Sequence, residues 1–180
     1  MKRQRLIFIS FILLAFIFSR AIDSSSASEP EIKGSEQFID QVQKALHLLK
    51  ERDADAYAIV TEYVGRIQEN ELSGMDPLAT PPTYYMSDIT AFSSVTWCAA
   101  TIAHDSFHSK LYHEYRRAHD GPVPSAVWKG REAEQQCIKH QLAVMERIGA
   151  PIEEIDHTKS LEDGRFVNDD GTRDDYSVPW

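Results

Sequence analysis

Four stretches of this chain carry apolar residues at the three- and four-residue spacing of an α-helix. The first begins at Ser35, and Asp53 is typical of a residue that caps a second helix, so the two together predict a helical hairpin. A third helix is expected over residues 93–118, beginning at either of two serines. A fourth is expected over residues 125–148, because Gly149 follows it directly. The pattern therefore predicts a mainly α fold.

The helical pattern is interrupted between residues 71 and 92. One glycine and three prolines in this range exclude a long helix, and the run from Thr83 to Met86 favours a short extended segment. The expected order is thus a helical hairpin, a short β element and two long helices. No internal repeat is present, so we expect a single mainly helical domain over residues 35–180.

The first 27 residues have the features of an export signal. Three of the first five residues are basic, and residues 6–18 form an apolar run broken by one serine. Such a run rises only about 20 Å as a helix, less than the roughly 30 Å of a membrane core. We therefore expect a signal peptide cleaved after Ala21 or Ala27, with an uncleaved anchor as the alternative. No stable membrane span is expected after cleavage.

Export and charge limit the class of protein. The chain has 19 basic and 28 acidic residues, a formal net charge of −9, and removing the basic start leaves the remainder more acidic. Because nucleic acids are bound by basic surfaces, we expect no nucleic-acid partner. The predicted protein is secreted or otherwise extracytoplasmic, with a solvated leader over residues 28–34 and a polar, acidic tail after Ile155.

The chain has two cysteines, Cys98 and Cys137. In an oxidising compartment two cysteines favour a disulfide, which here would join the third and fourth helices. The alternative is a pair of buried, unpaired thiols.

The third helix carries a histidine pair. His104 and His108 are four residues apart, so their imidazoles project from one face of the helix at a spacing that can hold one Zn²⁺ ion. Two histidines do not complete a zinc site, and a third ligand is therefore expected nearby.

Glu134 is the strongest candidate for that ligand. It interrupts the apolar stripe of the fourth helix, where an unpaired buried carboxylate would cost several kcal/mol. A metal ion would compensate it, and so would a basic side chain such as Lys110, Arg116 or Arg117. If a basic side chain compensates Glu134, His104 and Asp105 would form only a structural hydrogen-bonded pair.

With Asp105 after the first histidine, the pattern His104-Asp105-x-x-His108 resembles the His-Glu-x-x-His motif of zincin metallopeptidases of the gluzincin type. The resemblance covers residues 82–148 and implies a zinc-dependent hydrolase of peptide or amide bonds. It makes His104, His108 and Glu134 the Zn²⁺ ligands and Asp105 the general base, although the family has glutamate there.

The same resemblance suggests how a substrate would be held. The extended segment from Thr83 to Met86 would lie beside the cleft and receive a peptide or protein substrate by β-augmentation. Tyr112 and Tyr115 lie on roughly the histidine side of the helix and would contact the substrate or its oxyanion, with core packing as the alternative.

Two other functions fit parts of the sequence. The chain could be a secreted helical interaction domain without catalysis. His104 and Asp105 could also be the doublet of an HD-type metal-dependent phosphohydrolase. That activity needs an earlier histidine, for which His47 is available, and a later acid such as Asp156.

Overall fold

The computed structural model describes residues 28–162 of the chain. The predicted export signal and the tail from residue 163 onward lie outside the described residues. The described helices are α1 (Glu36–Arg52), α2 (Ala54–Tyr63), α3 (Asp88–Phe92), α4 (Val95–Ala118), α5 (Ala126–Lys129), α6 (Arg131–Ile148) and α7 (Ile152–Glu162). The described strands are β1 (Glu31–Lys33), β2 (Arg66–Glu69), β3 (Gly74–Asp76) and β4 (Thr83–Met86). The expectation of a mainly α fold with a small β element is confirmed.

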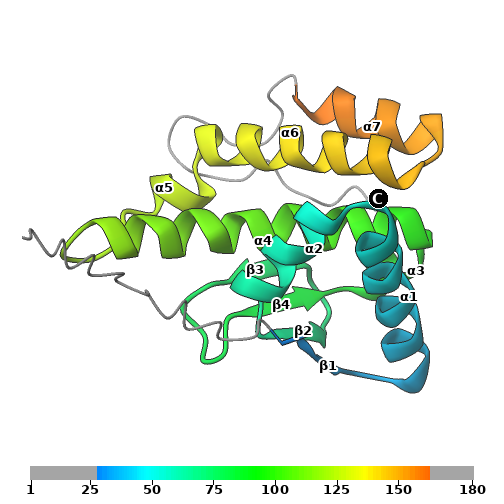
Figure 1. Ribbon diagram of the computed structural model, residues 1–180, viewed down its shortest axis with the longest axis horizontal. Helices are drawn as coiled ribbons and strands as arrows, with labels where there is room; N and C mark the ends of the chain where they lie inside the picture. The colour runs from blue at the N-terminus through cyan, green and yellow to red at the C-terminus, as the bar shows by residue number, and fades with distance from the viewer. Residues whose placement is uncertain (1–27, 163–180) are drawn as a thin grey trace, which may run out of the picture.

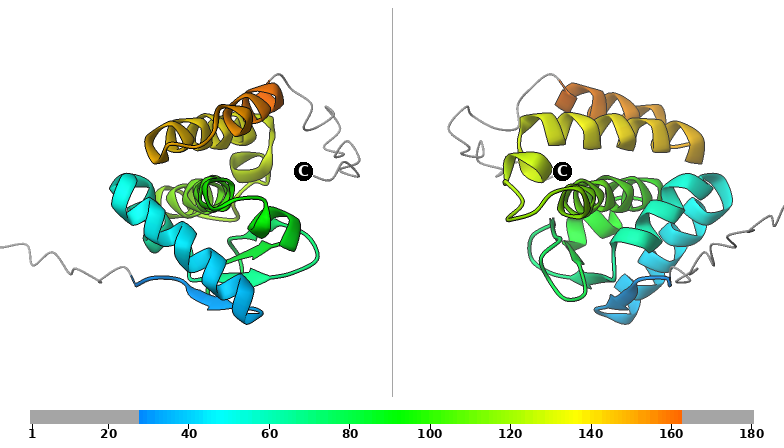
Figure 2. Two further views of the ribbon diagram at one scale, coloured as in Figure 1. Left: turned by 90° about the vertical axis from the view of Figure 1, so that its right-hand side faces the viewer. Right: turned by 60° about the vertical axis from the view of Figure 1, so that its left-hand side comes forward.

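Helix α4 is the central element of the fold. The α6–α7 pair lies on one side of it, and the sheet lies on the other together with α1 and α2 (Figures 1 and 2). Helix α4 therefore has two packed faces, one toward α6 and one toward the sheet and the first two helices.

The predicted helical hairpin is present. The Ser35 side chain accepts a hydrogen bond from the Phe38 amide, and the Asp53 side chain caps α2 in the same way. Helix α2 ends at Tyr63, earlier than its apolar pattern suggests, so that Ile67 lies in β2. The chain turns at a glycine, Gly65, where a Cβ atom would lie 2.4 Å from a side-chain carbon of Pro81.

The four strands form one sheet in the order β1-β2-β4-β3. Strands β1, β2 and β4 are parallel, and β3 is antiparallel to β4, with Ile67 opposite Tyr84 and Tyr84 opposite Met75. Strand β1 lies in the residues predicted to be a solvated leader. That expectation is wrong for Glu31–Lys33, which pair with β2.

The predicted extended segment is β4, and it is an inner strand. It is bonded to β2 on one side and to β3 on the other. Because both of its backbone edges are occupied, a substrate peptide cannot be added to it, and the expectation of β-augmentation at Thr83–Met86 is wrong.

The predicted fourth helix is divided in two. Gly130 has an extended backbone, with φ −88° and ψ 174°, and it separates α5 from α6. After Gly149, whose φ is +75°, the chain reverses into α7, and the part of this helix that follows Ile155 lies in the region predicted to be a polar tail. Ile155 and Thr158 of α7 are buried, so this helix belongs to the packed domain.

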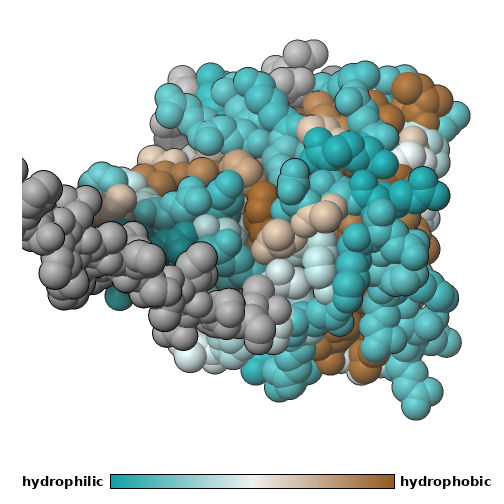
Figure 3. Space-filling view, in the orientation of Figure 1, coloured by the Kyte–Doolittle hydropathy of each residue, from teal (hydrophilic) through white to brown (hydrophobic). Residues whose placement is uncertain are grey.

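On the face drawn in Figure 3, the surface of the described residues is mostly hydrophilic. On that face, apolar side chains form several separate groups among hydrophilic ones. Among residues 28–162, no helix has the length and apolar character that a membrane span requires.

Candidate metal centre

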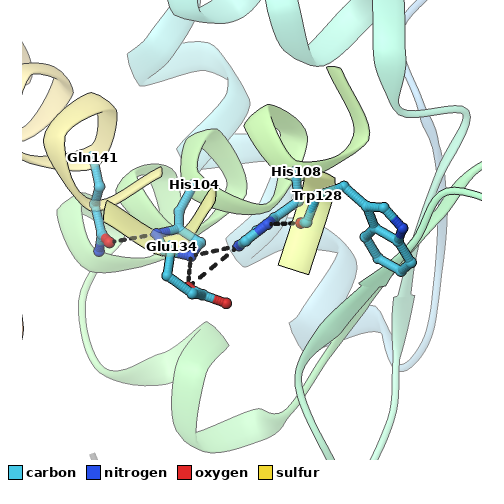
Figure 4. A network of polar contacts seen from close by, with 5 residues as sticks. All are labelled: His104, His108, Trp128, Glu134 and Gln141. Carbon is cyan, nitrogen blue, oxygen red and sulfur yellow. Dashed lines mark hydrogen bonds and ion pairs between the residues drawn. The ribbon is translucent and has the colours of Figure 1, made fainter. Parts of the chain in front are cut away.

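The histidine pair of α4 faces α6. His104 lies beside Gln141, whereas His108 lies beside the backbone of Trp128, and Glu134 contacts both rings (Figure 4). The two helices are therefore antiparallel at this level. The side chains are mostly shielded from solvent, with exposed fractions of 17% for His104, 7% for His108 and 20% for Glu134.

Three potential ligand atoms converge at this point. The Nε2 atoms of His104 and His108 are 3.1 Å apart, and each lies 3.5 Å from Oε2 of Glu134. A tetrahedral zinc ion with bonds of 2.0–2.2 Å would hold its N and O ligands about 3.3–3.6 Å apart. The three atoms thus have nearly the spacing of one face of such a tetrahedron, and the predicted convergence of these residues is confirmed.

Both imidazoles are oriented by an oxygen on their far side. His108 donates its Nδ1–H to the carbonyl oxygen of Trp128, and His104 donates its Nδ1–H to Oε1 of Gln141 at 3.0 Å (Figure 4). In a neutral ring this leaves Nε2 without a proton. Two nitrogen lone pairs and a carboxylate oxygen then point at one another, an arrangement that is stable only with a proton or a cation among them.

The electrostatics of the cluster indicate the same need for positive charge. Burial alone would raise the pKa of Glu134, but its interactions with His104 and His108 outweigh burial and hold the pKa far below its usual range. Burial alone would lower the pKa of His108, but the neighbouring Cys137 and Glu134 outweigh it and raise the pKa well above its ordinary value. The groups around His108 thus stabilise a cation, in the form of either an imidazolium or a metal ion.

Asp105 interacts electrostatically with this cluster and with the sheet residue Tyr84. Burial raises the pKa of its carboxyl group, and the nearby His104 and His108 offset part of that effect. Its neighbour in the sheet is Tyr84 of β4, whose pKa is raised by burial and by the Asp105 charge. The carboxyl group is therefore close enough to both imidazoles to interact with them electrostatically.

The predicted disulfide is not formed. Cys98 and Cys137 are both free and buried. In the antiparallel α4–α6 pair, Cys98 is opposite residues about ten positions after Cys137, a separation of roughly 15 Å along the helix axis. A disulfide requires Cα atoms within about 7 Å. The Cys98 thiol instead contacts the sulfur of Met86 at 3.8 Å in the core beside the sheet.

Cys137 lies at the site, although the sequence predicts it as one half of a disulfide. Its Sγ belongs with the ring nitrogens of His104 and His108 to a set of potential ligand atoms that lie within 4.8 Å of one another. Gln141 was not singled out from the sequence. The spacing of Glu134, Cys137 and Gln141 marks one face of α6, and this polar stripe could have indicated both residues.

The two tyrosines are not equally close to the site. Tyr112 is buried, and its ring packs edge-on against Trp128 at a centroid distance of 5.9 Å. Tyr115 stacks on His119 at 4.0 Å, and it is seven residues, or about 10 Å along the helix, beyond His108. These contacts show ring packing for both side chains.

The residues that a phosphohydrolase or a basic partner of Glu134 would require have other partners. His47 is exposed on α1 and forms an ion pair with Glu51, and Asp156 lies 4.0 Å from Lys159 on α7. Arg117, one of the basic residues considered for Glu134, pairs with Glu62.

The chain was compared with protein families, curated proteins and solved structures. No family model matches this chain, and neither a curated protein nor a solved structure matches it.

Proposed function

We propose that this protein is a zinc-dependent hydrolase of peptide or amide bonds, secreted by the cell, in which His104, His108 and Glu134 hold the metal. One observation carries the proposal. Three potential metal-ligand atoms lie 3.1–3.5 Å apart: Oε2 of Glu134 and the Nε2 atoms of His104 and His108, which carry no proton when the rings are neutral. A hydrogen bond at Nδ1 holds each imidazole in place.

The donor set favours zinc over other ions. Two imidazole nitrogens and one carboxylate oxygen are typical ligands of catalytic zinc, whereas Mg²⁺ and Ca²⁺ prefer oxygen ligands alone. When bound at this site, zinc would supply Lewis acidity to the carbonyl group that is attacked.

The residues of the chain would divide the remaining work. Gln141 and the Trp128 carbonyl fix the imidazoles through Nδ1, so that both Nε2 atoms would be available to hold the ion. Asp105 would take a proton from the attacking water and return it to the leaving amine. The resemblance of the motif to that of gluzincins supports this role, and the closeness of Asp105 to both histidines is consistent with it.

Zinc analysis of the purified full chain tests the metal site. We expect about one zinc ion per chain in the parent protein and none in His108→Ala. The matched control is His47→Ala, which removes an exposed histidine that pairs with Glu51 and should leave the zinc content unchanged. Equal zinc content in the parent and His108→Ala would overturn the proposal.

Cleavage of a mixed peptide library by the zinc-loaded protein tests the activity. We expect cleavage by the parent and little or none by Asp105→Asn, a variant that removes the proton acceptor but should keep the zinc. A zinc-loaded parent protein that cleaves no peptide or amide would reduce the site to a structural metal centre in a helical domain without catalysis.

A further inference from the structure

Cys137 lies in the candidate metal centre without a role in the proposed hydrolysis. The residue is fully buried and follows Glu134 by three positions, so both side chains leave the same face of α6 toward α4. Its Sγ atom lies within 4.8 Å of the ligand nitrogens of His104 and His108.

The distance from Cys137 to the site is short enough for coordination. A tetrahedral zinc ion with Zn–N bonds of about 2.0–2.1 Å and a Zn–S bond of about 2.3 Å holds nitrogen and sulfur roughly 3.5 Å apart. The sulfur therefore has to approach the ring nitrogens by at most about 1.3 Å to reach that separation.

Cys98 shows what a purely structural thiol looks like in this fold. It lies in the apolar core against Met86, and burial alone raises its pKa to about 12. By contrast, the Sγ atom of Cys137 lies within 4.8 Å of the ligand nitrogens of two histidines.

We propose that Cys137 is a fourth protein ligand, so that in the resting protein zinc is held by His104, His108, Glu134 and Cys137. This inference rests on the proposed function, because it requires the same ion. Coordination forms a zinc–sulfur bond and breaks the S–H bond, and the proton leaves to solvent, so no oxidant or reductant is needed.

A fourth protein ligand makes the resting site a closed one. Zinc sites with four protein ligands are typically structural, whereas catalytic sites keep one position open. Hydrolysis would then require the sulfur to leave, so Cys137 would restrain the activity of the resting protein.

X-ray absorption at the zinc edge distinguishes a site with the Cys137 sulfur bound from a site without it, because it measures the distance from zinc to each kind of ligand atom. The full chain loaded with one equivalent of Zn²⁺ is expected to show one sulfur at about 2.3 Å in addition to nitrogen and oxygen near 2.0–2.2 Å. Cys137→Ala should lose the sulfur contribution. The matched control Cys98→Ala removes the other buried thiol and should retain it.

The outcomes separate this proposal from the proposed function. A parent protein that binds one zinc ion without sulfur would overturn the role of Cys137 and leave the hydrolase proposal standing. A parent that binds no zinc would overturn both. Loss of zinc from Cys137→Ala but not from Cys98→Ala would support Cys137 as a ligand.

The rate of peptide cleavage supplies a second measurement. If the sulfur occupies the position needed for hydrolysis, zinc-loaded Cys137→Ala should cleave peptides several-fold faster than the parent. A slower or equal rate at equal zinc content would overturn the restraining role, whatever the absorption spectrum shows. Circular dichroism of both cysteine variants checks that the helices are intact.

Discussion

The two ends of the α4–α6 pair are built from opposite kinds of residue. At one end, Trp97 and Ala100 of α4 pack with Met145 of α6 in a small apolar cluster that includes Ile155 of α7. At the other end, the same two helices bring together His104, His108, Glu134, Cys137 and Gln141.

The apolar end stabilises the packing of the two helices, whereas the polar end forms the candidate metal centre. The apolar end gains free energy from burial without further partners, at about 25 cal/mol per Å² of apolar surface. The polar end buries ionisable groups, which is favourable only when each is compensated. We therefore expect mutations at the first end to lower stability and mutations at the second to act mainly through metal binding.

The largest expected effect is the stabilisation of the fold by zinc. With free zinc at 1,000 times the dissociation constant, the free energy of unfolding should rise by about 4 kcal/mol, because only the folded chain assembles the site. Urea unfolding with and without zinc measures the difference. Glu134→Gln should show little of this gain, and an equal gain in the parent and this variant would place the metal elsewhere.

At the apolar end, Met145→Ala should lower the free energy of unfolding by about 3 kcal/mol, since it removes a fully buried side chain and leaves a cavity. The measurement is urea unfolding of the zinc-free protein. The zinc content of the folded variant should stay at the parent's level. If it fell in proportion to the lost stability, the two ends would not be independent.

His140 makes the stability depend on pH. The residue stacks on Phe107, and burial together with Arg147 lowers its pKa from 6.5 to about 4. The folded state favours the neutral His140 ring. The stability that this neutral ring contributes is therefore fully present above about pH 6.5, and it is lost as the pH falls toward 4. The expected loss is roughly 2–3 kcal/mol.

The matched variant is His140→Phe, which keeps an aromatic ring against Phe107 and removes the titrating group. Its free energy of unfolding, measured in urea at several pH values on zinc-free protein, should fall less between pH 6.5 and 4 than that of the parent. Identical pH profiles would show that His140 does not contribute.

The smallest expected effect is that of Gln141→Leu. This variant removes the oxygen that accepts from His104 and keeps a buried side chain of similar size. Loss of such an outer partner costs about ten- to a hundredfold in metal affinity. Competition with a chromophoric chelator measures it. An unchanged affinity would mean that α4 alone orients His104.

The sequence predicted the three converging side chains because each of them has a local signature. His104 and His108 are four residues apart on a regular helix, and Glu134 interrupts an apolar stripe. Both patterns depend only on helix geometry. The helical hairpin and the bounds of α4 were predictable for the same reason, with serine and aspartate caps at the helix starts.

The features that the sequence did not predict depend on contacts between distant segments. Cys98 and Cys137 lie on neighbouring helices, and only the antiparallel register shows that they are too far apart to bond. Strands β1 and β3 have three residues each, too few for a period-two pattern to be distinguished, so their pairing with β2 and β4 decides their structure. Helix α7 is polar on most of its surface and forms because Ile155 and Thr158 pack inward.

The break at Gly130 has a consequence for the imidazole that it lies beside. In an uninterrupted helix, the carbonyl of Trp128 would accept the amide of Glu132, four residues on. Because the backbone leaves helical geometry at Gly130, that oxygen is available to His108 instead. A single residue without a side chain thus frees a main-chain oxygen to hold the His108 ring, and it couples the bend between α5 and α6 to the orientation of that imidazole.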